Sequence, residues 1–215
     1  MKNIEKTNKK QRKTELKFFS KIIQMIIGLL GKNRVGKDTF AEYLINNCGF
    51  VRYAFADPIK DIARILFNFS EEQLYGNKKE DIDIRYGISP RQFFQKMGTE
   101  IMQYDIYKHL PGLRETVPPR EMWVVIFREW YKKQLEIDGN VNVVISDVRF
   151  FHELRCIKEL GGMIVKIIRP SVEIKDEEHQ SEIETQQIPD TDIDKIIIND
   201  SSIENFHHKI KEIIG

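Results

Sequence analysis

The sequence predicts an α/β fold in which helices cover both faces of a parallel sheet. Short apolar runs alternate with amphipathic segments of helical length, which is the pattern of repeated βαβ units. A glycine-rich turn joins the first apolar run to the first amphipathic segment, as in a phosphate-binding loop. The 215 residues, 41% hydrophobic and 31% charged, suit a single domain with one sheet.

The first strand is expected over 22–30, directly before the glycine-rich loop. Both loop glycines let the backbone curl so that its N–H groups point at phosphate oxygens, while a lysine and the dipole of the following helix add positive potential. The position that usually carries a hydroxyl holds Asp38, and a hydroxyl follows at Thr39. We therefore expect a nucleoside triphosphate to bind the loop residues, which are Gly31, Lys32, Asn33, Arg34, Val35, Gly36, Lys37, Asp38 and Thr39.

Helix caps, apolar periodicity and stop signals predict the remaining elements. Ser70 has the spacing of a capping box, and the polar, weakly periodic segment 77–87 is expected to be a mobile loop. The carboxyl ends of parallel strands lie at one sheet edge, where ligands are expected. Strands are predicted over 51–56, 141–146, 163–168 and 195–198, and helices over 57–67, 89–101, 120–137, 150–160 and 203–214.

The charge is unevenly distributed along the chain. Residues 1–21 contain eight Lys or Arg and two Glu, while the predicted domain, 22–215, is mildly acidic. This basic tail is expected to be a solvated, poorly ordered extension, and a contact with nucleic acid is the alternative. The apolar run 22–30 is too short to span a membrane and lacks a small-residue cleavage site, so neither a signal peptide nor a membrane anchor is expected.

The cysteines argue against a disulfide framework and against a zinc site. Cys48 and Cys156 lie far apart in the sequence, and neither belongs to a pair with metal-ligand spacing. A reducing compartment is therefore expected, with a cytoplasmic protein as the simplest interpretation.

A second chemical signal follows the apolar run 142–146, which ends at Asp147. A carboxylate at the end of a strand beside a phosphate-binding loop suits Mg²⁺, directly or through water, although such an Asp is equally often the N-cap of a helix. Arg149 follows in the same turn, and Glu153 lies one helical turn further on. Charges grouped in this way need to pair with one another or with a charged ligand, because burying them alone is costly.

A third signal lies in the predicted helix 89–101. Arg91, Gln95 and Gly98 recur at helical spacing and are expected to share one face. An arginine there can fork onto a monophosphate, a glutamine can read the edge of a base, and a glycine admits close backbone approach. This face is therefore the expected site of an acceptor nucleotide.

Together these motifs resemble the deoxynucleoside monophosphate kinases of bacteriophages and large DNA viruses, which belong to the P-loop nucleoside monophosphate kinase group. The resemblance covers the chain from about residue 26 to its end, and it includes the Gly-Lys-Asp-Thr loop ending that is usual in that family. The other matching elements are 56–60, 91–100, 146–150 with Glu153, Gly161-Gly162, Arg169-Pro170, 179–182 and Asn199-Asp200.

The resemblance implies a three-layer P-loop kinase fold that transfers the ATP γ-phosphoryl group to a deoxynucleoside 5′-monophosphate with Mg²⁺. It also implies a homodimer in some relatives and, for a viral protein, the host cytoplasm. Lys37, Asp38, Asp147 and Arg149 are the expected catalytic residues, and Thr39, Asp38 and Asp147 the expected metal group. The expected acceptor-site residues are Asp57, Lys60, Arg91, Gln92, Gln95, Gly98, Thr99, Trp123 and Glu153.

Between two predicted strands, residues 171–190 are polar and contain no arginine, where related kinases carry a lid over the phosphates. The positive charge is therefore expected from Arg34, Arg149 and Arg169, unless Arg169 packs on adenine with Asn199-Asp200 beneath the base.

Two alternatives to this function remain open. One is another small-molecule kinase such as phosphomevalonate kinase, and the other is a non-catalytic module that binds nucleotides or nucleic acid.

Overall fold

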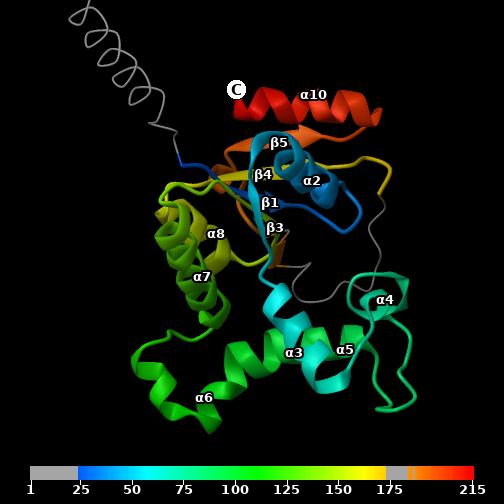
Figure 1. Ribbon diagram of the computed structural model, residues 1–215, viewed down its shortest axis with the longest axis vertical. Helices are drawn as coiled ribbons and strands as arrows, with labels where there is room; N and C mark the ends of the chain where they lie inside the picture. The colour runs from blue at the N-terminus through cyan, green and yellow to red at the C-terminus, as the bar shows by residue number, and fades with distance from the viewer. Residues whose placement is uncertain (1–23, 173–183, 186) are drawn as a thin grey trace, which may run out of the picture.

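The computed structural model describes residues 24–172, 184–185 and 187–215. In these ranges five parallel strands form one sheet in the order β2-β3-β1-β4-β5 (Figure 1). The predicted tail, 1–21, lies outside the described residues, as does most of the predicted lid. The strands are β1 (Ile26–Leu30), β2 (Val51–Tyr53), β3 (Val143–Val148), β4 (Met163–Ile168) and β5 (Lys195–Ile198).

Most predicted helices are present with nearly the expected bounds. The α-helices are α2 (Lys37–Cys48), α3 (Asp57–Phe67), α4 (Glu71–Leu74), α5 (Pro90–Gln95), α6 (Ile106–His109), α7 (Met122–Asp138), α8 (Phe151–Glu159) and α10 (Ile203–Ile214). Short 3-10 helices occur at η1 (Asn77–Lys79), η3 (Pro111–Glu115) and η4 (Asp190–Asp192), and a π-helix at η2 (Lys96–Asp105). None of the described helices is both long and apolar enough to cross a membrane.

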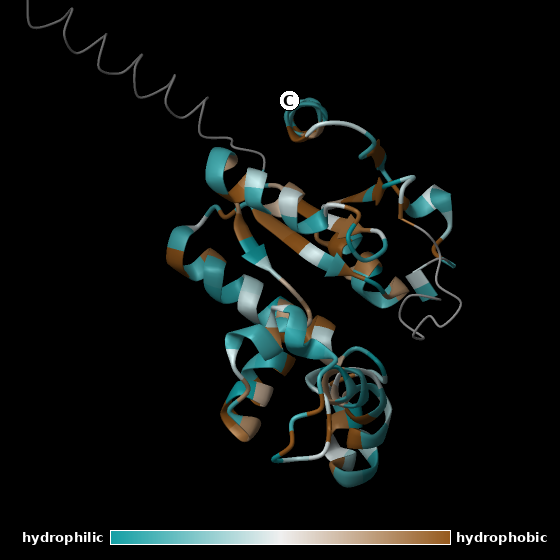
Figure 2. Ribbon diagram, turned by 90° about the vertical axis from the view of Figure 1, so that its right-hand side faces the viewer, coloured by the Kyte–Doolittle hydropathy of each residue, from teal (hydrophilic) through white to brown (hydrophobic). Residues whose placement is uncertain are grey.

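The central strand β1 is buried on both faces. Ile27 and Leu29 belong to the apolar core formed with α2 and α10, whereas Ile26 and Leu30 belong to the core formed with α7 and α8. Because successive side chains of a strand point to opposite faces, this division shows three layers, with helices on both sides of the sheet. Figure 2 shows the corresponding brown, apolar strands between helices with teal outer surfaces.

The connections that leave β1 and β3 run to opposite faces of the sheet. β1 continues into α2, β3 continues into α8, and the two strands are direct neighbours. Such a switch point opens a crevice at the carboxyl ends of the two strands, and ligands of doubly wound sheets bind there. The P-loop kinase architecture expected from the sequence is therefore confirmed, and the glycine-rich loop and Asp147 lie at the carboxyl ends of these two neighbouring strands.

The helices from α3 to α6 form a second group below the sheet in Figure 1. Here the predicted end of one helix, near residue 101, is wrong: α5, η2 and α6 follow one another from Pro90 to His109. The expected loop 77–87 also contains more structure than its composition indicates. Asp83 is buried and accepts hydrogen bonds from Gln73 and Arg85, and it forms an antiparallel bridge with Ile88.

Candidate functional site

Two glycines shape the phosphate-binding loop at the end of β1. Gly31 has φ 148° and Gly36 has φ 112°, conformations that residues with a Cβ rarely adopt. A Cβ added to Gly31 would lie 2.5 Å from the carbonyl oxygen of Ile167, and one added to Gly36 would lie 2.6 Å from Nδ2 of Asn199. Both positions therefore require glycine for conformational and steric reasons.

Two side chains donate hydrogen bonds to carbonyl oxygens of the loop: Lys37, which belongs to the loop, and Asn199, which does not. Lys37 Nζ donates to the carbonyl oxygens of Gly31 and Lys32, each at 2.6 Å. Asn199, directly after β5, donates from Nδ2 to the carbonyl oxygen of Val35 at 2.8 Å. The sequence suggested that Asn199 lies beneath a base, whereas its side chain is bonded to the loop itself.

The remaining loop residues differ in their exposure. Val35 is buried in the core with α2 and α10 and anchors the loop, while Asn33 and Arg34 are exposed, Arg34 in the left-handed region at φ 64°. Asp38 and Thr39 lie in the first turn of α2, with Asp38 exposed and Thr39 half-buried. The helix N-terminus, which favours anions, is thus accompanied by a carboxylate and a hydroxyl suited to a cation.

Asp147, near the end of β3, fixes the turn between β2 and α3. Its two carboxylate oxygens accept hydrogen bonds from the backbone N–H groups of Phe55 at 2.8 Å and Ala56 at 2.9 Å. Asp147 is not a helix N-cap, because α8 begins only at Phe151. Each oxygen keeps a further lone pair after these bonds.

Glu153, one of the expected acceptor-site residues, bonds to the backbone of the turn that carries Arg149. Its side chain is buried, and Oε2 accepts hydrogen bonds from the backbone N–H groups of Arg149 at 2.8 Å and Phe150 at 3.1 Å. Burial, followed by the negative charge of Asp147, raises the pKa of Glu153 to about 8. Glu153 therefore shapes the Arg149 turn from below and holds a proton at neutral pH.

Three predicted acceptor-site residues of α3 and α5 take part in ion pairs. Asp57 accepts from Arg52 at 2.7 Å and from Lys60 at 3.3 Å. Lys60 Nζ also lies 4.2 Å from the centroid of the Tyr75 ring. On α5, Arg91 Nε donates to Glu80 at 2.8 Å, which leaves the two terminal nitrogens of its guanidinium group available for a fork onto an anion.

Lys79 of η1 lies one residue before Glu80, the ion-pair partner of Arg91. Burial, followed by the positive charges of Lys60 and Arg91, lowers the pKa of Lys79, while the negative charge of Asp38 opposes this change. The charges that act on this one side chain thus come from α3, α5 and α2. Sequence analysis missed Lys79, because nothing in the polar segment 77–87 distinguishes it from its neighbours.

Arg91 and Gln95 lie one turn apart in α5, whereas Gly98, predicted to share their face, lies beyond the end of this helix. Gly98 lies in the π-helix η2, where a Cβ would meet Ile59 of α3 at 2.7 Å, so its close approach is to another helix. Thr99 beside it is buried, and Gln95 is half-buried at the end of α5. Gln92 caps α5, with Oε1 accepting from the N–H of Ser89 at 3.0 Å.

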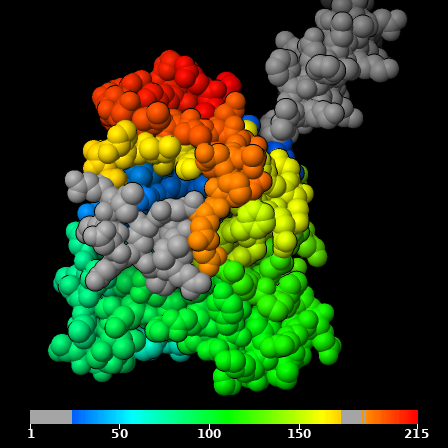
Figure 3. Space-filling model, turned by 180° about the vertical axis from the view of Figure 1, so that it is seen from behind, coloured from blue at the N-terminus to red at the C-terminus, as the bar shows by residue number. Residues whose placement is uncertain are grey.

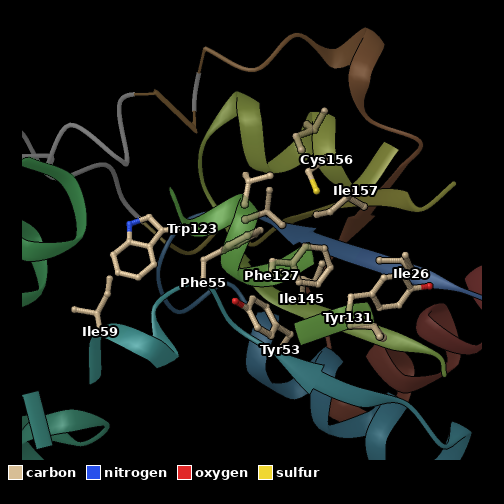
Figure 4. Close-up of a cluster of buried hydrophobic side chains, with 14 of the residues drawn as sticks. Ile26, Tyr53, Phe55, Ile59, Trp123, Phe127, Tyr131, Ile145, Cys156 and Ile157 are labelled. Carbon is tan, nitrogen blue, oxygen red and sulfur yellow. The ribbon is translucent and has the colours of Figure 1, made fainter. Parts of the chain in front are cut away.

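Trp123, included among the expected acceptor-site residues, is part of the core. The side chain is 2% exposed, and its Nε1 donates to the carbonyl oxygen of Gly98 at 2.7 Å. Figure 4 shows the indole beside Ile59 at the edge of the core cluster. The same carbonyl accepts from Nε2 of Gln103, which is also buried, so Gly98 joins α7 to the π-helix.

Arg120 and Arg149 contact the described end of the predicted lid. Arg120 Nη2 donates to Glu184 at 2.6 Å, and the Arg120 guanidinium lies 5.6 Å from the Tyr104 ring centroid. The hydroxyl of Thr185 donates to the carbonyl oxygen of Arg149 at 3.0 Å. No motif indicated the link through Arg120.

Arg169, the remaining predicted ATP contact, is exposed directly after β4.

In the space-filling view, blue atoms from the start of the described chain lie between the yellow and orange C-terminal elements and the green helices (Figure 3). The site thus combines a phosphate-binding loop, a hydroxyl and carboxylates, and a separate group of cations from the helices below the sheet. This arrangement suits two phosphorylated ligands and a divalent cation.

Comparison with known proteins agrees with this geometry. The sequence matches the family described as deoxynucleotide monophosphate kinase over residues 25–84 and 66–210. It is 39% identical over 189 residues to a deoxynucleotide monophosphate kinase homologue of Acanthamoeba polyphaga mimivirus, covering 86% of this chain and 94% of the relative. It is 25% identical over 246 residues to the deoxynucleotide monophosphate kinase of Escherichia phage RB69, covering 88% and 99% of the two chains.

Among solved structures, a dephospho-CoA kinase from Campylobacter jejuni matches with a TM-score of 0.46 and 17% identity, over 88% of this chain and 94% of the other. The sequence matches extend over most of the chain and include the phosphate-binding loop, the β3 carboxylate and the helices below the sheet. The chain belongs to the deoxynucleotide monophosphate kinase family.

Proposed function

We propose that this chain transfers the γ-phosphoryl group of ATP to the 5′-phosphate of a deoxynucleoside monophosphate, giving a deoxynucleoside diphosphate and ADP. The observation that supports this most strongly is the presence of two separate groups of cations. Lys37 bonds to the phosphate-binding loop, whereas Lys60 and Arg91 belong to α3 and α5, two helices that contact each other. A kinase whose acceptor is itself a phosphate needs both groups.

In the proposed reaction, an oxygen of the acceptor phosphate forms a bond to the γ-phosphorus. The bond between that phosphorus and the β–γ bridging oxygen breaks, and ADP leaves with the electron pair. Lys37 and the loop N–H groups hold the β- and γ-phosphates, and Lys60 and Arg91 hold the acceptor phosphate. Arg149, on the turn shaped by Glu153, neutralises charge on the phosphoryl group in transfer.

The residues near the loop fit Mg²⁺. This ion is usually bound by one or two carboxylates, several waters and the substrate phosphates. Thr39 and Asp38 are placed in the first turn of α2 for the closest contacts. Asp147 already accepts two amide hydrogen bonds, and it retains lone pairs for a bound water. When bound, Mg²⁺ would neutralise charge between the β- and γ-phosphates.

The test is a panel of deoxy- and ribonucleoside monophosphates, each incubated with ATP and Mg²⁺, with ADP release and nucleotide products measured together. We expect ADP and a nucleoside diphosphate in equal amounts for at least one deoxynucleotide, and neither with Lys37→Ala. Phosphomevalonate is included as the competing acceptor. Turnover of phosphomevalonate alone, or salt-dependent DNA binding without turnover of any acceptor, would contradict the proposal.

A further inference from the structure

Lys79 is the most unusual cation of the helices below the sheet. It ends η1 and is half-buried, whereas the preceding residues Asn77 and Lys78 are exposed. Its ammonium group makes no hydrogen bond and no ion pair with any of the described residues. A partly desolvated ammonium group without a carboxylate partner is unfavourable, so such a group calls for an explanation.

The backbone of η1 is fixed beside α5. Glu80, the next residue after Lys79, accepts a hydrogen bond of 2.8 Å from Arg91. On the other side, Lys60 of α3 lies over the ring of Tyr75, at the end of α4 and four residues before Lys79. The residues on either side of Lys79 in the sequence, Glu80 and Tyr75, therefore contact a cation of α5 and a cation of α3.

Lys60 and Arg91 each have a carboxylate partner, Asp57 and Glu80 respectively. Lys79 shares this positive neighbourhood, and its pKa is lowered by burial and by those two cations. Like charges brought together repel, and folding alone gains nothing from adding a third cation here. An anion that all three contact would reverse this repulsion. The segment 171–190 contains no arginine, so charge for the phosphates has to come from other parts of the chain.

We propose that Lys79 is a third cation of the acceptor-phosphate site and binds the monophosphate together with Lys60 and Arg91. This inference rests on the proposed function and extends it to a residue in a segment without a recognisable motif. Asp38, in the first turn of α2, also acts on Lys79 from the side of the phosphate-binding loop.

The test compares Lys79→Met with Lys78→Met, which removes an exposed charge one residue away. Lys79→Met removes one charge-assisted hydrogen bond to the acceptor phosphate. The binding free energy of such a bond predicts a rise of about 10- to 100-fold in the KM for the deoxynucleotide. The KM for ATP should change less than about twofold by the same reasoning, because Lys79 is separate from the loop. Lys79→Arg should restore most of the acceptor affinity, and Lys78→Met should behave as the wild type.

Thermal unfolding distinguishes binding from structural support. If Lys79 serves the ligand, Lys79→Met relieves repulsion with Lys60 and Arg91, so its Tm should equal or exceed that of the wild type while acceptor affinity falls. A lower Tm together with equal losses for both substrates would assign Lys79 a structural role. Acceptor KM values that match in Lys79→Met and Lys78→Met would also overturn the proposal.

Calorimetry separates failure of this inference from failure of the proposed function. Titration of the wild type and Lys79→Met with dTMP, dGMP and inorganic phosphate, without ATP, measures anion binding independently of turnover. If the wild type phosphorylates no nucleotide, the proposed function fails, but a loss of phosphate binding specific to Lys79→Met still supports the anion site. Equal binding of all three probes to both proteins would refute the role of Lys79, whatever the reaction.

Discussion

Nδ2 of Asn199 donates a hydrogen bond of 2.8 Å to the carbonyl oxygen of Val35 in the phosphate-binding loop. The same nitrogen occupies the space that a Cβ on Gly36 would need. A residue at the end of β5 therefore fixes the loop conformation from outside, at a distance of more than 160 positions in the sequence. Preorganised N–H groups are what allow such a loop to bind phosphate without rearrangement.

Asn199→Ala should weaken ATP binding more than acceptor binding, because it frees the loop carbonyl without touching the acceptor cations. The loss of one hydrogen bond corresponds to about 1 kcal/mol, or about a fivefold rise in the KM for ATP. Asn205→Ala is the matched control, since Asn205 lies in α10 and its side-chain amide donates to the hydroxyl of Ser201 on the surface and not to the loop. Equal KM values for ATP in the two variants would show that Asn199 does not shape the loop.

Lys37→Ala should reduce kcat by about 10²- to 10³-fold, because it removes a positive charge directed at the transferred phosphoryl group. Lys37 donates to the carbonyl oxygens of Gly31 and Lys32 within the loop and not to the core, so the fold should persist. Circular dichroism and thermal unfolding would confirm a native variant, and a rapid-quench assay would measure turnover. Turnover close to that of the wild type would remove Lys37 from the catalytic group.

Asp38→Ser should shift the dependence of the rate on Mg²⁺ concentration several-fold while leaving the acceptor KM nearly unchanged. The substitution restores the hydroxyl common in phosphate-binding loops but removes a carboxylate from the first turn of α2. Glu42→Ser removes an exposed carboxylate one turn later in the same helix and serves as control. Superimposable Mg²⁺ titrations of Asp38→Ser and the wild type would contradict a role in metal binding.

Local signals predicted most of the secondary structure because they act within a few residues. The capping box at Ser70 formed as expected, and α3 and α10 have the bounds that their periodicity predicts. The strand, loop and helix around Gly31 and Gly36 followed from the need for positive φ at the two glycines.

The remaining features depend on contacts between distant segments. The π-helix η2 changes which side chains share a face, so the spacing of Arg91 and Gly98 could not be interpreted as that of a single α-helix. The indole of Trp123 binds the Gly98 carbonyl, a partner 25 residues away that periodicity cannot identify. Lys79 could not be identified from the sequence, because the contact of Glu80 with Arg91 is what brings η1 beside α5.

Glu153 should make stability fall as pH rises, in contrast to an ordinary paired carboxylate. Its pKa is raised to about 8 in the folded chain, from 4.5, so the folded state holds a proton that the unfolded state releases between these values. The stability that neutral Glu153 contributes is thus complete below pH 4.5 and is lost as pH rises to about 8. The slope is at most about 1.4 kcal/mol per pH unit.

Urea unfolding of the wild type and Glu153→Gln from pH 4 to pH 9 isolates this effect, because both proteins share every other titrating group. The glutamine can still accept from the N–H groups of Arg149 and Phe150 but cannot ionise. We expect the stability of the wild type to decline relative to the variant over this interval. A constant difference between the two proteins would show that Glu153 has the same pKa in the folded and the unfolded chain, and would contradict the raised value.

Arg91→Lys should raise the KM for the deoxynucleotide by about 10-fold with a much smaller effect on the KM for ATP. Arg91 donates from Nε to Glu80, and its two terminal nitrogens can form a fork onto the phosphate. A lysine ammonium keeps the charge but cannot reproduce this geometry. Arg128→Lys is the matched control. Arg128 also makes an ion pair, with Glu159, but it belongs to α7 and not to the helices α3 and α5. Surface pairs of that kind are worth at most about 1 kcal/mol, so Arg128→Lys should leave both KM values unchanged. Equal changes in the two KM values for Arg91→Lys, or none, would place Arg91 among the surface ion pairs and leave the acceptor phosphate to other cations.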